Sequence, residues 1–93
     1  MSYELRFHVD AKREWDQLDT SIREPFKNKL RERLIEPHVP SARLRGFAGH
    51  AYKIKLTALG YRLVYTIDGE TLTVIAVGKR ERNAVYKSAT KRK

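Results

Sequence analysis

The sequence contains no cysteine, which excludes disulfide bonds and thiolate chemistry. It also lacks any apolar run close to the ~20 residues needed to cross a bilayer, and its N-terminus has no apolar signal-peptide core. Acidic residues are scarce, because 11 Asp and Glu stand against 20 Lys and Arg and leave a formal net charge of +9. We therefore expect a cytoplasmic protein with no membrane partner, whose partner is rich in phosphate. An acidic protein partner is the alternative explanation of the charge, and the two are compatible.

Length and apolar content predict one folded domain over residues 1–93. A chain of 93 residues with 41% apolar composition is large enough to bury a core and too apolar to be disordered throughout. The sequence shows neither an internal repeat nor a low-complexity linker that would divide it.

Hydrophobic periodicity predicts a strand and then two helices in the first half of the chain. Apolar and polar residues alternate over 3–9, as in a strand with one buried face. Asp10 is placed to cap a short helix that carries Trp15, and Ser21 with Glu24 fits the capping box of a second helix. In this second helix, apolar residues recur every four positions and charged residues cover the other side: Ile22, Phe26, Leu30 and Leu34 against Lys27, Lys29, Arg31, Glu32 and Arg33. The two helices are expected to form a hairpin that packs on a sheet.

Two neighbouring stretches, 52–56 and 61–65, alternate with period two and predict an antiparallel hairpin. A turn centred on Ala58 and Leu59 would place Lys55 opposite Arg62. Like charges in directly opposite positions cost a few tenths of a kcal/mol to about 1 kcal/mol. Lys53 shares their face, whereas the apolar residues of both stretches occupy the other. Stability alone gives no reason for this arrangement, so we interpret the cationic face as a binding site for a polyanion.

The last third of the chain predicts one more strand and a short helix. With a turn at Asp68-Gly69, residues 71–77 form a central strand in which Ile75 lies opposite Arg62 and Ala76 joins the core face. A basic segment follows, Lys79-Arg80-Glu81-Arg82, and then a short helix over 83–90 with a frayed basic end at 91–93.

The predicted fold class is therefore α+β. It consists of a strand, a helical hairpin, a three-stranded antiparallel meander and a short C-terminal helix, with the helices packed on one sheet face. The opposite face, which carries the cations, is expected to stay open.

Nothing in the sequence indicates a metal, a cofactor or a hydrolytic triad. His8, His38 and His50 lack the spacing of metal ligands. Gly78-Lys79 lacks the earlier glycine of a phosphate-binding loop. We therefore expect no metal and no cofactor.

The residues that remain for chemistry are mainly cationic: Lys53, Lys55, Arg62 and Arg80, with Tyr86 close to Arg80 in the sequence. Arginine offers a planar fork for phosphate oxygens, and a lysine surrounded by cations favours its neutral form and can accept a proton. An aromatic ring can stack on an unpaired base. These residue types suit the recognition of a phosphodiester and its cleavage. The residues alone leave a solvated basic surface and a core tyrosine open as alternatives.

Three segments resemble the RelE family of bacterial toxins: 51–56 (AYKIKL), 60–65 (GYRLVY) and 77–86 (VGKRERNAVY). The segment 44–46 (LRG) and Trp15 are similar to the family as well, and the resemblance runs through nearly the whole chain in the same order. It implies a ribosome-dependent endoribonuclease that cuts mRNA in the decoding site (A site) of the small ribosomal subunit. It also implies a cognate RelB-like antitoxin, through which alone the toxin would reach operator DNA.

The resemblance assigns a role to each matching residue. Lys53 and Lys55 would hold the scissile phosphate and help remove the 2′-hydroxyl proton, and Arg62 would stabilise the developing phosphorane. Arg80 would act on the side of the leaving 5′-oxygen, and Tyr86 would stack on a base and orient the sugar. RNA binding is expected of three further cations, Arg45, Lys79 and Arg82. The implied reaction is in-line attack of a 2′-hydroxyl on its own 3′-phosphate, without a metal.

Two other function classes remain as alternatives. A ParE-like relative would share the scaffold and inhibit DNA gyrase by binding it, and a non-catalytic module would only bind RNA or the ribosome. The complete cationic set with Tyr86 favours cleavage, because a gyrase-binding protein has no need of that set.

Overall fold

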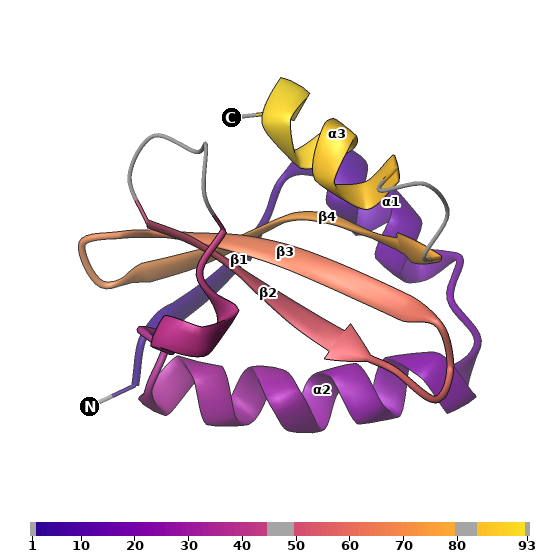
Figure 1. Cartoon of the computed structure of the whole chain (residues 1–93), viewed down its shortest axis with the longest axis horizontal. Coiled ribbons are helices and arrows are strands. Elements are labelled where there is room, and N and C mark those ends of the chain that lie inside the picture. Colours follow the sequence, from indigo (N-terminus) through magenta and orange to yellow (C-terminus); the bar gives the residue numbers. More distant parts are fainter. Residues whose placement is uncertain (1, 45–49, 80–83, 93) are drawn as a thin grey trace.

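The computed structural model describes residues 2–44, 50–79 and 84–92, which form a four-stranded sheet with helices packed against it (Figure 1). The strand order is β1-β4-β3-β2, with β1 parallel to β4 and the other neighbours antiparallel. Along the chain the elements are β1 (Glu4–Phe7), α1 (Val9–Asp16), α2 (Thr20–Ile35), the 3-10 turn η1 (Pro40–Ala42), β2 (His50–Leu56), β3 (Tyr61–Asp68), β4 (Thr71–Lys79) and α3 (Ala84–Arg92). This succession confirms the predicted α+β fold class.

The β2–β3 hairpin has the predicted register. Ile54 lies opposite Leu63, and Lys55 lies opposite Arg62. The turn closes with a hydrogen bond from the Gly60 N–H to the Leu56 carbonyl (2.8 Å). Gly60 has φ of +72°, a left-handed conformation that a residue with a Cβ adopts only at a cost. The turn therefore fixes the register that brings the two cations together.

The register predicted between β3 and β4 is wrong, because Arg62 lies opposite Gly78 and not opposite Ile75. Part of the difference comes from the turn. Its central residues are one position later than expected, between the paired residues Asp68 and Thr71. Moving a two-residue turn by one position shifts every pair that follows by two.

A β-bulge accounts for the remaining shift. Tyr65 pairs with Val74 whereas Val64 pairs with Ala76, so β4 carries Ile75 as an extra residue at that point. As a result Ala76 packs with Val64 and Ile75, on the opposite side from the core face that the sequence predicted for it. The bulge thus gives the second face of the sheet an apolar patch.

The two faces of the sheet are covered by different helices. The α1–α2 hairpin packs on one face, as predicted, through Ala11, Trp15, Ile22, Phe26 and Leu30. The other face was expected to be open, and this expectation is wrong. There, Val85 and Ala89 of α3 pack on the bulge patch, and Figure 1 shows α2 and α3 on opposite sides of the sheet.

Both predicted helix caps differ from those in the structure. His8 caps α1 by accepting a hydrogen bond from the Asp10 backbone N–H at Nδ1 (3.1 Å). The N-cap of α2 is Asp19, without a side-chain hydrogen bond, so the expected Ser21–Glu24 capping box does not begin this helix. None of the helices within the described ranges is long and apolar enough to cross a membrane.

The C-terminal end was predicted to be frayed, but α3 continues to Arg92. The Arg92 guanidinium binds both carboxylate oxygens of Glu14, at 2.7 and 3.2 Å. This hydrogen bonding, with the charge of Glu14, raises the pKa of Arg92 above its ordinary value against the opposing effect of burial. The last turn of α3 is therefore tied to α1.

Candidate nucleic-acid interface

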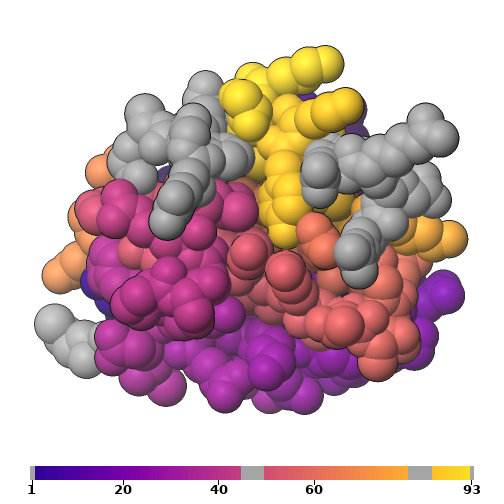
Figure 2. Space-filling model, in the orientation of Figure 1, coloured from indigo at the N-terminus to yellow at the C-terminus, as the bar shows by residue number. Residues whose placement is uncertain are grey.

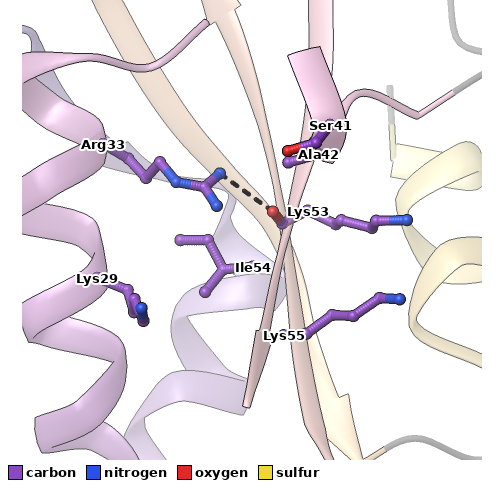
Figure 3. Close-up of a pocket in the computed structure, with 7 residues that line it drawn as sticks. All are labelled: Lys29, Arg33, Ser41, Ala42, Lys53, Ile54 and Lys55. Carbon is purple, nitrogen blue, oxygen red and sulfur yellow. Dashed lines mark hydrogen bonds between the residues drawn. The ribbon is translucent and has the colours of Figure 1, made fainter. Parts of the chain in front are cut away.

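Three cations of the predicted site lie on one side of the β2–β3 hairpin. Lys55 and Arg62 are direct neighbours in the ladder, and Lys53 shares their face because side chains alternate along a strand. Figure 3 shows Lys53 and Lys55 extending from β2 in parallel, away from α2 and toward α3, whereas Ile54 between them points to the core. The strand thus directs two ammonium groups to the side on which α3 packs.

Tyr86 of α3 lies against Arg62. An Arg62 Nη1 donates a hydrogen bond to the Tyr86 hydroxyl oxygen (3.1 Å), and the guanidinium carbon is 5.4 Å from the ring centroid. Both residues are half-buried. In Figure 2, α3 sits directly above atoms of β2 and β3. The packing that holds α3 on the sheet therefore also places an aromatic ring on the arginine of the candidate site.

Lys79 is the last residue of β4 and lies opposite Tyr61. Because Gly78 is the partner of Arg62, Lys79 is exposed at the same end of the sheet as the cationic pair. Arg45, Arg80 and Arg82 lie outside the described residues, so their roles stay predictions.

A cavity of about 300 Å³ opens beside the outer strand β2 (Figure 3). Seven residues line it: Lys29, Arg33, Ser41, Ala42, Lys53, Ile54 and Lys55. Four of them are cationic, and Figure 3 shows Lys29 and Arg33 of α2 on one side of β2 and the side chains of Lys53 and Lys55 on the other.

Arg33 in this lining is a residue that the sequence analysis misplaced on the solvent side of α2. Its Nη1 donates to the Lys53 carbonyl (3.1 Å) and to the Tyr65 hydroxyl (2.9 Å). It therefore anchors the outer strand at Lys53. A signal was present in the sequence, because Arg33 follows the buried Leu30 by three residues, and i,i+3 positions share a helix face.

Tyr65 supports the hairpin from the core side. Its side chain is fully buried, and its hydroxyl donates to the Pro37 carbonyl (2.7 Å) while accepting from Arg33. Burial raises the pKa of Tyr65, and the hydrogen bond and charge of Arg33 oppose the rise. The backbone that carries Lys53 is thus held by a partly buried hydrogen-bond network.

The histidines have structural neighbours. The rings of His38 and His50 are 5.3 Å apart, and His38 Nδ1 lies 3.1 Å from the Tyr52 hydroxyl. His8 is the helix cap described above. Among residues 2–44, 50–79 and 84–92, no three His, Cys, Asp or Glu side chains gather in a way that could hold a metal ion.

The arrangement offers groups that can bind both the phosphate and the base of RNA. Arg62 presents a planar set of donors, of which Tyr86 uses only one. Lys53 and Lys55 add positive charge on the same face, and the ring of Tyr86 offers a stacking surface for a base.

The sequence of this chain is similar to those of known bacterial toxins. The model of a family described as the ParE toxin of the type II toxin–antitoxin system parDE matches residues 5–84. A putative RelE-like toxin protein of Escherichia coli is 49% identical over 94 residues, which cover 99% of this chain and 98% of that protein. The mRNA interferase toxin RelE of E. coli K12 is 47% identical over the same shares.

Solved structures extend the likeness to the fold. An arginine-to-alanine double mutant of E. coli toxin RelE in the free state matches with a TM-score of 0.89 and 44% identity, covering 99% of this chain and 98% of that one. A chain of the intact E. coli RelBE toxin–antitoxin complex matches with a TM-score of 0.81 and 46% identity, covering 87% of this chain and 100% of that one. Sequence and fold thus agree over most of the chain.

Proposed function

The chain belongs to the RelE/ParE family of toxins from type II toxin–antitoxin systems, and we propose that it is a ribosome-dependent endoribonuclease. It cleaves mRNA in the ribosomal A site and so inhibits translation. The name mRNA interferase, carried by E. coli and Shigella flexneri relatives at 47% identity, supports this activity.

The observation that carries the proposal is the placement of Arg62 between a lysine and a tyrosine. Lys55 is its direct partner across the ladder, and Tyr86 contacts it from α3. The register places two cations directly opposite each other on one face of the hairpin. A phosphate bound between them would interact favourably with both, which supports an RNA backbone as the ligand.

The reaction is an in-line displacement within the RNA. The 2′-oxygen forms a bond to the adjacent phosphorus while the bond from phosphorus to the 5′-oxygen breaks, leaving a 2′,3′-cyclic phosphate and a 5′-hydroxyl. Lys53 and Lys55 hold the phosphate and help withdraw the 2′-hydroxyl proton. Arg62 stabilises the charge that develops on the equatorial oxygens, where fixed donors are worth most.

Tyr86 and Arg80 complete the site. Tyr86 stacks on a base and orients the sugar, and Arg80 stabilises the leaving 5′-oxygen. Arginine keeps its proton near neutral pH, so Arg80 acts through its charge, and the 5′-oxygen takes its proton from water. With neither histidine nor carboxylate in the proposed set, catalysis relies on in-line placement of the strand, which the ribosome provides. Arg45, Lys79 and Arg82 add contacts to RNA.

A cognate RelB-like antitoxin is the proposed protein partner. The solved complexes of relatives with RelB support it, since those relatives share 43% to 46% identity with this chain. Operator DNA is reached only through that antitoxin. The site of action, the translating ribosome, places the protein in the cytoplasm.

The proposal is tested with purified protein, programmed ribosomes and free mRNA. We expect cuts within the A-site codon, with 2′,3′-cyclic phosphate ends, on ribosomes and little cleavage of free mRNA. Arg62→Ala should abolish the cuts. Arg6→Ala is the matched control, because Arg6 is an exposed arginine of β1, at the sheet edge opposite to β2. Intact mRNA on ribosomes with the wild-type protein would refute the proposal.

A second function deserves the same test, because the matching family model is itself described as a ParE toxin. A ParE-like toxin would inhibit supercoiling by DNA gyrase and leave mRNA on ribosomes intact. The contact of Arg62 with Tyr86 favours RNA cleavage, since an aromatic ring held over a phosphate-binding arginine has a direct use on single-stranded RNA.

A further inference from the structure

Glu14 of α1 and Arg92 of α3 form an ion pair that joins two elements from opposite ends of the chain. Arg92 Nη1 and Nη2 lie 2.7 and 3.2 Å from the two carboxylate oxygens of Glu14. Asp10 adds a longer contact to Arg92, at 3.9 Å. Only 18% of the Arg92 side chain and 34% of the Glu14 side chain is exposed. A bidentate, partly buried pair of this kind has a defined geometry, unlike a pair on the open surface.

The same two side chains also bind the backbone of β4. β1 ends at Phe7, opposite Val74, so the part of β4 that follows has no strand beside it on that edge. Arg92 donates to the carbonyl of the bulge residue Ile75 (3.0 Å), and Glu14 accepts from the Val77 N–H (3.2 Å). The pair therefore satisfies a donor and an acceptor of β4 that a longer β1 would otherwise have served.

The polar contacts of Arg92 matter for the position of α3, because few apolar side chains hold this helix on the sheet. In this nine-residue helix the buried described side chains are those of Val85 and Ala89. An isolated helix of this length is not stable in water. Its position therefore depends on contacts at both ends: Val85 and Tyr86 at the first turn, and Arg92 at the last.

We propose that Glu14 and Arg92 are positioning residues for Tyr86: by fixing the last turn of α3 to α1 and β4, they hold the Tyr86 ring on Arg62. This inference rests on the proposed function, because it gives the position of Tyr86 a catalytic purpose. It adds two residues that lie outside the cationic site and that do not touch the RNA. Figure 1 shows α3 alongside α1 at the edge of the sheet, as the ion pair requires.

Hydrogen exchange of the α3 amides in the full chain tests the geometric half of the proposal. Arg92→Ala should speed this exchange about tenfold or more, equivalent to about 1.4 kcal/mol of lost local stability. Lys91→Ala is the matched control, because it removes the same charge from an exposed neighbour on the same helix. Glu14→Gln removes the charge but keeps an acceptor for the Val77 N–H. It should speed α3 exchange in the wild-type background, and it should have little effect on that exchange in Arg92→Ala, where the ion pair is already lost. Unchanged exchange in Arg92→Ala would overturn the proposal.

Cleavage on programmed ribosomes tests the functional half. Arg92→Ala should lower kcat about tenfold with a smaller change in KM, because a misplaced group costs rate rather than ground-state binding. In a protein that already carries Tyr86→Ala, Arg92→Ala should lower kcat less than about twofold, because the effect of Arg92 on cleavage depends on the Tyr86 ring. Equal losses in both backgrounds would overturn the positioning role. If the wild-type protein cleaves nothing, the proposed function fails, and the exchange measurement still decides whether the pair fixes α3.

Discussion

Replacing Arg62 by lysine separates the geometry of the guanidinium from its charge. Arg62→Lys keeps a cation opposite Lys55, so the electrostatics of the ladder are nearly unchanged. It removes the planar fork and the hydrogen bond to the Tyr86 hydroxyl, which is 3.1 Å long in the structure. A side chain that served only to attract RNA would tolerate this change. One that must match the phosphorane oxygens would not.

The magnitudes keep the two explanations apart. Loss of the hydrogen bond to Tyr86 costs about 0.5–1.5 kcal/mol of folding stability, and weakening of the cation–π contact at 5.4 Å costs about 0.5–1 kcal/mol. The free energy of unfolding of the variant should therefore be lower than that of wild type by no more than about 2.5 kcal/mol. Loss of one donor aimed at developing charge lowers a rate about 10²- to 10³-fold. Because Arg62→Lys keeps the positive charge, we expect the cleavage rate to fall by about 10²-fold, near the lower end of that range.

The assay is single-turnover cleavage of mRNA on programmed ribosomes at saturating protein, with urea unfolding of the same preparations. Arg6→Lys is the control, because it makes the same exchange at an exposed position of β1. A rate for Arg62→Lys within about threefold of wild type would refute the reasoning, since it would show that charge alone suffices. A rate loss that tracks the fraction unfolded would refute it as well.

Three further predictions concern the support of the site and its chemistry. Tyr65→Phe should lower the free energy of unfolding by about 1–3 kcal/mol, because it leaves the Pro37 carbonyl without its donor and removes one of the two acceptors of Arg33 Nη1; a loss below about 0.5 kcal/mol in urea unfolding would contradict this. Burial raises the pKa of Tyr65 above 10.0, so the unfolded state releases that proton first. Stability should therefore fall as pH rises above about 10, by at most about 1.4 kcal/mol per pH unit from this group, and the fall should be shallower in Tyr65→Phe; equal slopes would count against the assignment. Finally, Arg80→Ala should abolish growth arrest on expression while the circular dichroism spectrum stays native, and arrest as strong as wild type would speak against a role in cleavage.

The β2–β3 hairpin could be predicted from the sequence because local rules determine it. Period-two alternation set the faces, and the short turn before Gly60 set the pairing of Lys55 with Arg62. The β3–β4 register could not be predicted in the same way. The bulge at Ile75 interrupts the period inside a continuously apolar strand, where alternation gives no signal.

Long-range polar contacts account for the rest of what the sequence did not reveal. The spacing of Arg33 from Leu30 indicates its helix face, but its partners, the Lys53 carbonyl and the Tyr65 hydroxyl, belong to other elements and follow from no local pattern. Glu14 and Arg92 are 78 positions apart, so no local pattern links them. The sheet face on which α3 packs could not be predicted either, because the apolar patch that receives Val85 and Ala89 exists only once the bulge at Ile75 has formed.

The central claim is that cations and an aromatic ring on one sheet face cause the RNA to cut itself through its own 2′-hydroxyl. The most direct test is an mRNA with one 2′-deoxynucleotide at the mapped scissile position, presented on programmed ribosomes beside its all-ribose counterpart. The claim predicts that the all-ribose mRNA is cut there to a 2′,3′-cyclic phosphate and that the substituted mRNA stays intact at that bond. Cleavage of both mRNAs at equal rates would contradict it.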